Sequence, residues 1–99
     1  MAHGEYKTPG GKLVMVDFKV IDGQIREPVI SGDFFLYPDE ALDPMTAALD
    51  GLSASLDEES LALAVRMAMP GGTDLIGTSP EGIAIAVRRA LTAAEDTSR

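Results

Sequence analysis

Residues 12–31, KLVMVDFKVIDGQIREPVIS, decide the fold, because they carry the clearest periodic pattern in the chain. From position 14 every second residue is a large apolar one, which predicts a strand with one buried face. These residues are Val14, Val16, Phe18 and Val20. Asp22-Gly23 follows, and this pair favours a two-residue β-hairpin turn, in which both positions need a positive φ angle. We therefore predict a hairpin whose second strand runs from about residue 24 to 31.

The second strand contains a conflict that predicts a β-bulge. Simple pairing across the turn places Glu27 opposite Phe18, yet a glutamate is rarely buried. Pro28 has no backbone N–H to donate to a neighbouring strand, so it belongs at an edge or a bulge. We therefore expect a bulge near Arg26–Pro28, which turns Ile30 toward the core.

The chain changes character on both sides of this hairpin. Residues 1–11 are polar and rich in glycine, which predicts a flexible arm or loop. After a Gly-Asp bend, residues 34–37 (FFLY) predict a short third strand that ends at Pro38. The predicted sheet is therefore antiparallel, has three strands and spans residues 12–37.

The second half of the chain has the apolar spacing of helices. Asp43-Pro44 has the residues preferred at the N-cap and first position of a helix, and Gly51 is typical of a helix end. Ser55 and Glu58 have the spacing of a capping box, which predicts the start of a second helix. That helix ends before Pro70.

Ser79-Pro80 opens a third helix, and residues 96–99 are expected to fray. The helical part thus covers residues 43–95. Together these elements predict a single α+β domain over residues 1–99, in which a three-stranded antiparallel sheet packs against about three helices.

The composition excludes several classes of function. The 99 residues suffice for one small domain, and the formal net charge of −8 disfavours nucleic acid, whose recognition depends on Lys and Arg. Without cysteine the chain has no thiolate nucleophile and no cysteine ligand for a metal or an iron–sulfur cluster. It also has no apolar run of membrane-spanning length and no signal-peptide pattern, so we expect a cytoplasmic protein.

Few residues have the chemistry of a catalytic or metal site. His3 is the one histidine, but in a flexible arm it lacks the neighbours that orient a catalytic base. The acidic run Asp57-Glu58-Glu59 falls in the first turn of a predicted helix, where the helix dipole favours carboxylates. We therefore predict no catalytic residue and no metal site in this chain.

The segment Pro9-Gly10-Gly11-Lys12 is the strongest candidate for binding. It lacks the spacing of a Walker phosphate-binding loop and precedes a strand rather than a helix. Its glycines can nevertheless present backbone N–H groups to an anion, and Lys12 and Lys7 add positive charge in an acidic chain. A simple turn with solvated lysines also explains these residues.

Asp33 and the pair Phe34-Phe35 have two interpretations each. Asp33 acts as an isolated acid, or it serves only the bend between two strands. The two rings fill the core of a chain that has few aromatic residues, or one of them anchors an interface. The residues alone leave these alternatives open.

Longer motifs resemble a known family. They are HGEYKTPGGKL at residues 3–13, VDFKVIDGQI at 16–25 and ISGDFFLYPDEAL at 30–42. In combination they resemble the accessory domain of lipoate–protein ligases, and LDGL at 49–52 and IGTSPEGI at 76–83 extend the likeness more weakly. Pro28 departs from the family pattern, in which an aliphatic residue is usual. The domain is C-terminal in some ligases and a separate small subunit in others. Since this chain begins near the domain's start, we expect the second arrangement.

The resemblance implies a role in a two-part ligase. The large subunit of such a ligase uses lipoate, ATP and magnesium to make lipoyl-adenylate, and then transfers the lipoyl group to a lysine of a lipoyl domain. The small domain is needed mainly for activation, and its fold is similar to that of iron–sulfur-cluster scaffold proteins. We therefore expect this chain to bind no cofactor alone, to form a heterodimer with the large subunit and to meet the lipoyl domain transiently.

The resemblance also predicts that the segment from Lys7 to Lys12 docks near the adenylate pocket of the large subunit. Its glycines would allow close approach, and Lys12 would favour the charge developing on phosphate. The predicted contact residues are Lys7, Pro9, Gly10, Gly11, Lys12, Asp33, Phe34 and Phe35. The alternatives are a cysteine-free interaction module of the iron–sulfur-scaffold fold with no ligase role, and a small enzyme that acts alone.

Overall fold

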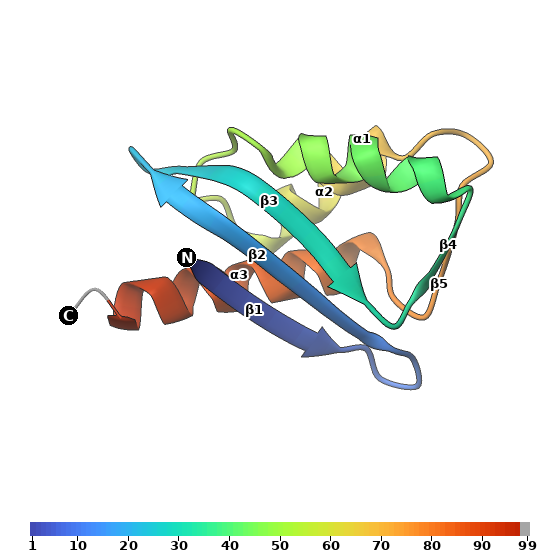
Figure 1. Ribbon diagram of the computed structural model, residues 1–99, viewed down its shortest axis with the longest axis horizontal. Helices are drawn as coiled ribbons and strands as arrows, with labels where there is room; N and C mark the ends of the chain where they lie inside the picture. Colours follow the sequence, from blue (N-terminus) through green and yellow to red (C-terminus); the bar gives the residue numbers. More distant parts are fainter. Residues whose placement is uncertain (98–99) are drawn as a thin grey trace.

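The fold comes from a computed structural model, which describes the backbone of residues 1–97 and the side chains of residues 1–93. Its elements are β1 (Ala2–Lys7), β2 (Leu13–Ile21), β3 (Gln24–Gly32), β4 (Phe35–Tyr37), the 3₁₀ turn η1 (Asp39–Ala41), α1 (Leu42–Leu49), α2 (Glu58–Ala68), β5 (Asp74–Ile76) and α3 (Pro80–Thr97). Strands β1, β2 and β3 form one antiparallel sheet, whereas β4 and β5 form a separate one. In Figure 1 the larger sheet crosses the front of the molecule, and the small sheet lies at the right-hand end. None of the helices over residues 1–97 is long and apolar enough to span a lipid bilayer.

The predicted α+β class and three-stranded antiparallel sheet are confirmed, but the sheet contains different strands. β1, predicted as part of a flexible arm over residues 1–11, forms one edge of the sheet, which therefore covers residues 2–32 rather than 12–37. The buried positions of β1 include the small residues Ala2 and Gly4, so the sequence lacks the alternation of large apolar residues that predicts a strand. At the buried Gly4, a Cβ atom would lie 2.6 Å from the backbone nitrogen of Ala90 in α3, so only glycine fits without a shift.

The hairpin of β2 and β3 forms as predicted. In Asp22-Gly23 both residues have positive φ angles, 53° and 74°. Two residues of β3, Glu27 and Pro28, face the single residue Phe18 of β2, and this is the predicted bulge. Ile30 turns back to the core beyond the bulge and is buried.

The predicted core position of Val20 is wrong, because its side chain is 42% exposed. The loop after α1 covers the tip of the hairpin only along β3. There the Ile25 N–H donates to the Leu52 carbonyl oxygen (2.8 Å), and the Gly51 N–H donates to the Ile25 carbonyl oxygen (2.7 Å). Val20 lies on the neighbouring strand, outside this cover, so the alternating pattern of β2 extends further than the core does.

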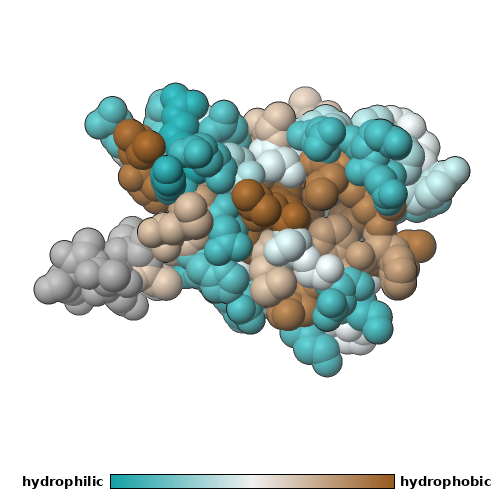
Figure 2. Space-filling model, viewed as in Figure 1, coloured by the Kyte–Doolittle hydropathy of each residue, from teal (hydrophilic) through white to brown (hydrophobic). Residues whose placement is uncertain are grey.

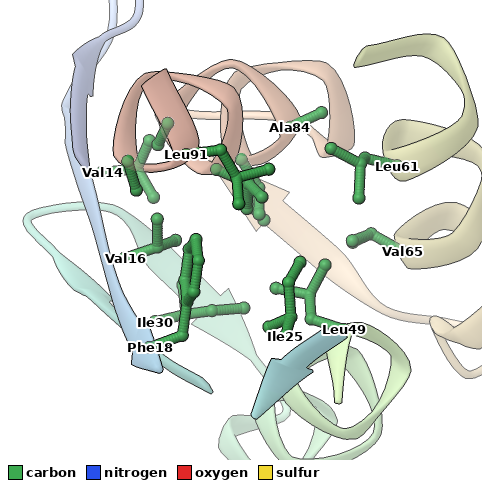
Figure 3. Close-up of a cluster of buried hydrophobic side chains, with 14 of the residues drawn as sticks. Val14, Val16, Phe18, Ile25, Ile30, Leu49, Leu61, Val65, Ala84 and Leu91 are labelled. Atoms are coloured by element: carbon green, nitrogen blue, oxygen red, sulfur yellow. The ribbon is translucent and has the colours of Figure 1, made fainter. Parts of the chain in front are cut away.

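One hydrophobic core joins the larger sheet to the three helices. Figure 3 shows its side chains converging from β2 (Val14, Val16, Phe18), β3 (Ile25, Ile30), α1 (Leu49), α2 (Leu61, Val65) and α3 (Ala84, Leu91). Each of these residues is at most 4% exposed. Burial of this apolar surface is the main driving force for folding, and it comes from one face of the sheet only.

The first two predicted helices exist, but both begin elsewhere than predicted. α1 begins at Leu42, directly after η1, so Asp43-Pro44 lies inside its first turn instead of at the cap. Asp57 rather than Ser55 caps α2, and its Oδ1 accepts a hydrogen bond from the Ser60 N–H (2.8 Å). Asp57 directly precedes α2, so its short side chain reaches the free backbone N–H groups of the first turn and makes the cap.

The predicted ends of α1 and α2 and the predicted start of α3 are confirmed. Gly51 follows α1 with a φ angle of 86°, and α2 ends before Pro70. Ser79 caps α3, because its Oγ accepts a hydrogen bond from the Gly82 N–H (3.0 Å). α3 continues to residue 97, into the end that was expected to fray, and residues 98–99 lie outside the described residues.

Candidate functional site

The segment between β1 and β2 is a closed turn rather than a flexible loop. The Gly11 N–H donates to the Thr8 carbonyl oxygen (2.8 Å), and the Thr8 N–H donates to the Lys12 carbonyl oxygen (3.1 Å). Gly10 has a φ angle of 70°, which glycine adopts without strain. Pro9 and Gly10 are exposed at the tip of the turn, so a partner can reach its backbone.

This turn is attached to the segment that follows β5. The Lys12 N–H donates to the Gly77 carbonyl oxygen (2.7 Å), and the Thr8 hydroxyl donates to the Thr78 hydroxyl oxygen (3.1 Å). At Gly77 a Cβ atom would lie 2.8 Å from Cγ of Lys12, so the stem of the lysine side chain packs on this glycine. These contacts fix the position of Lys12, while the residue as a whole remains exposed.

β4 and β5 form a small sheet beside the turn, which we call the ribbon. In it Phe35 pairs with Ile76, and Tyr37 pairs with Asp74. Phe34, directly before β4, is partly buried against the core, whereas Phe35 is 67% exposed. Of the two predicted rings, one therefore helps to fill the core and the other faces the solvent.

The predicted contact residues come together at one end of the molecule. Lys7 is the last residue of β1 and pairs with Leu13, whose carbonyl oxygen accepts a hydrogen bond from the Asp33 N–H (3.0 Å). Figure 1 shows that the β1–β2 turn, the bend after β3 and the ribbon lie at the same end. We call this region, residues 7–12, 33–37 and 74–77, the ribbon end. It offers an exposed lysine, an accessible glycine backbone and an aromatic surface, which suit binding rather than catalysis.

The structure corrects the prediction for His3, which lies in β1 and not in a flexible arm. Its Nδ1 is 2.7 Å from Oδ1 of Asp17, and its Nε2 is 2.7 Å from Oε2 of Glu5. Ionised carboxylates only accept hydrogen bonds, so this arrangement favours the imidazolium form, in which both ring nitrogens donate. The hydrogen bond to Glu5, followed by that to Asp17, raises the pKa of His3 above its ordinary value. Both ring nitrogens of this histidine are thus engaged by carboxylates of its own sheet.

Among the side chains of residues 1–93, no group of three or more His, Cys, Asp or Glu is placed to hold a metal ion. In the acidic run at the start of α2, Asp57 serves the helix cap. Hydrogen bonding from the Ser60 backbone N–H lowers the pKa of Asp57 below its usual value. The carboxylates of this run therefore stabilise the helix terminus, in the way that the helix dipole favours.

Sequence reasoning missed two exposed apolar or aromatic residues of the ribbon end. Tyr37 and Ile76 are 73% and 61% exposed, and they share the outer face of the ribbon with Phe35. From the sequence, Tyr37 is predicted only as the end of a short strand. β5 has three residues, Asp-Leu-Ile, which are too few to show a period, so nothing in the sequence placed Ile76 beside Phe35.

Comparison with known proteins relates the fold of this chain to a lipoylation system. No protein-family model matches the chain, and no curated protein matches it. Among solved structures, it is similar to a chain of an archaeal lipoylation system, described as a bi-partite lipoate protein ligase and its E2 lipoyl domain from Thermoplasma acidophilum. The two chains share 26% sequence identity with a TM-score of 0.71, over 87% of this chain and 92% of the other. The resemblance to lipoate–protein ligases is confirmed.

Three of the five motifs that carry the ligase resemblance reach the ribbon end, whereas the other two, residues 16–25 and 49–52, meet around Ile25 near the tip of the β2–β3 hairpin. Residues 3–13 form β1 and the glycine turn, residues 30–42 run through β4, and residues 76–83 lead from β5 into α3. The hydrogen bonds from Lys12 to Gly77 and from Asp33 to Leu13 join these motifs in space. These three motifs are thus contiguous in space, although their chain positions are up to seventy residues apart, as those of Thr8 and Thr78 are.

Proposed function

We propose that this chain is the accessory subunit of a two-part lipoate–protein ligase. Its partner would be a larger catalytic chain, which binds lipoate, ATP and magnesium, forms lipoyl-adenylate and transfers the lipoyl group to a lysine of a lipoyl domain. This chain would pair with that catalytic chain in the cytoplasm, and would meet the lipoyl domain only transiently. In this role the chain would act by binding its partner, and the partner would supply the catalytic groups.

One observation carries this proposal: the structural match spans nearly the whole length of both chains, and the other chain comes from a bi-partite ligase system. The two chains therefore match over most of their lengths and not through one shared motif. The alternative role, holding an iron–sulfur cluster, is disfavoured because the chain has no cysteine thiolate to bind the iron.

The ribbon end offers a physical basis for help with activation. The backbone hydrogen bond to Gly77 and the contact of its stem fix the base of the Lys12 side chain, so the ammonium group is presented from a defined point. A positive charge at the rim of the partner's pocket stabilises the negative charge that develops on phosphate during adenylate formation. The exposed Gly10 lets this backbone approach a partner without interference from a side chain.

Reconstitution with the ligase catalytic chain of the same organism tests the proposal. Lipoate, ATP and magnesium are incubated with the catalytic chain, with this chain, or with both, and pyrophosphate release is measured. We expect adenylate formation to be about tenfold faster or more with both chains present than with the catalytic chain alone. Equal rates with and without this chain would refute an accessory role, and pyrophosphate release by this chain alone would identify it as an enzyme in its own right.

A further inference from the structure

The outer face of the ribbon is an exposed apolar surface. Phe35, Tyr37 and Ile76 are 67%, 73% and 61% exposed. Leu36 and Leu75, the pair between them, are partly buried and pack against the core. Side chains alternate between the two faces of a strand, so the inner face holds the ribbon to the body and the outer face is left open. Figure 2 shows apolar surface at the right-hand end of the molecule, where Figure 1 places β4 and β5.

The size of this surface indicates what else a partner must touch. At the exposures given above, and with about 150–250 Å² for a whole aromatic side chain, the three residues leave roughly 400 Å² open. A standard protein interface takes about 800 Å² from each partner, so the ribbon face supplies roughly half of one. The glycine turn is the adjoining surface, because Lys12 is bonded to Gly77 directly after Ile76. Together the ribbon face and the turn form one continuous contact area.

Charge is unevenly distributed along this contact area. Lys12, Lys7 and one exposed acid, Asp33, lie at the Phe35 end of the ribbon, whereas Asp74 pairs with Tyr37 at the other end. The exposed acids Asp39 and Glu40 follow directly after that end of β4. A matching partner therefore has an apolar hollow for two rings, an anionic group facing Lys12 and basic side chains facing the acidic end. A catalytic chain that holds a negatively charged adenylate near the docking site meets the condition at Lys12.

We propose that the outer face of the ribbon, Phe35, Tyr37 and Ile76, is the hydrophobic centre of the surface that docks on the ligase catalytic chain. This inference rests on the proposed function and extends it, because it moves the centre of the contact from the glycine turn to the ribbon. The turn is then the rim of the interface, and the apolar centre places Lys12 beside the partner's pocket.

The test compares two double variants in titration calorimetry with the purified catalytic chain of the same organism. Phe35→Ser/Ile76→Ser removes two residues from the proposed centre. Val29→Ser/Leu63→Ser is the matched control, since these side chains are similarly exposed (56% and 53%) but lie on β3 and α2. We expect the ribbon variant to bind with a Kd about 30-fold higher or more, because it loses interface hot spots. The control variant is expected to bind like the wild type. Far-ultraviolet circular dichroism and thermal melting check that both variants fold.

The outcomes separate this inference from the proposed function. If the wild type binds the catalytic chain and the ribbon variant binds equally well, the ribbon inference is wrong while the accessory role stands. If both double variants weaken binding alike, the ribbon has no special role and the inference is again wrong. If the wild type does not bind at all, both proposals fail. Light scattering adds one further case: a dimer of this chain that only the ribbon variant dissociates would identify a second copy as the occupant of this face.

Discussion

The two sheets differ in the face that they turn to the solvent. The open face of the larger sheet mixes charged pairs, such as His3 with Asp17 and Lys19 with Glu27 (Nζ–Oε2 3.0 Å), with single exposed apolar residues such as Val29. The open face of the ribbon carries large apolar side chains, Phe35 among them. An antiparallel sheet can keep one polar face in water, so the larger sheet needs no cover. Three of the four residues on the outer face of the ribbon, all but Asp74, are large apolar or aromatic ones that are exposed, and a protein partner that covers them gains most.

The largest expected effect separates a buried ring from an exposed ring. Phe18→Ala removes a fully buried ring from the core, and we expect the free energy of unfolding to fall by about 3–5 kcal/mol. Phe35→Ala removes a ring that is mostly exposed, and we expect a change of about 0.5 kcal/mol or less. Urea denaturation of the isolated chain measures both. A large loss of stability in Phe35→Ala would mean that the ribbon face supports the fold itself.

A second comparison concerns the close contact between the larger sheet and α3. In Gly4→Ala the added methyl group would meet the backbone of Ala86 and Ala90, so we expect a loss of about 2–3 kcal/mol in unfolding free energy. Gly71→Ala is the control, because no atom lies within 4 Å of a Cβ at that position. Thermal and urea unfolding of the two variants check this. Equal stabilities would show that β1 is not held against α3 as described.

Lys12 tests the function of the ribbon end rather than its stability. In the reconstituted pair we expect Lys12→Ala to slow adenylate formation about tenfold, because a fixed positive charge beside the phosphate is lost. Lys19→Ala, whose lysine pairs with Glu27 on the larger sheet, should leave the rate unchanged. Pyrophosphate release measures both, and preformed lipoyl-adenylate isolates the transfer step. An unchanged rate for Lys12→Ala would leave the turn without an electrostatic role.

The smallest expected effect is the pH dependence of the charged face. The carboxylates of Glu5 and Asp17 raise the pKa of His3 above its ordinary value of 6.5. This contribution to stability is therefore complete below pH 6.5 and is lost as the pH rises through the raised pKa. A proton NMR titration of His3 gives that pKa, and unfolding midpoints across the same window give its effect. In His3→Gln we expect the same unfolding midpoint at the low-pH and the high-pH end of this window. A titration midpoint at or below 6.5 would contradict the geometry.

The sequence predicted the parts of the fold that depend on neighbouring residues. The turn at Asp22-Gly23, the bulge at Glu27-Pro28 and the cap at Ser79 follow from local backbone requirements, and each is present. β1 and β5 were missed because their positions depend on distant contacts. A strand with Gly4 at its centre is stable only against α3, and β5 has only three residues and pairs only with β4.

The same division holds for the candidate site. The resemblance selected residues of the glycine turn, the bend at Asp33 and the phenylalanine pair, and the structure brings them to one end. Whether they contact a catalytic chain stays a prediction. Ile76 could not be found in this way. It is exposed on the same face as Phe35 because the two residues pair across the ribbon, and Phe35 is forty-one positions away in the chain.

The bulge in β3 has a consequence for how the chain behaves before it meets any partner. β3 is an outer strand of the larger sheet, and an unprotected outer strand is a template on which further chains can add, one after another, into fibres. Glu27 at a φ angle of 55° and the ring of Pro28 interrupt the row of hydrogen-bonding groups. The loop after α1 bonds to Ile25 ahead of that interruption. The bulge and the loop thus leave few free backbone groups in register along this part of β3 for another strand to pair with.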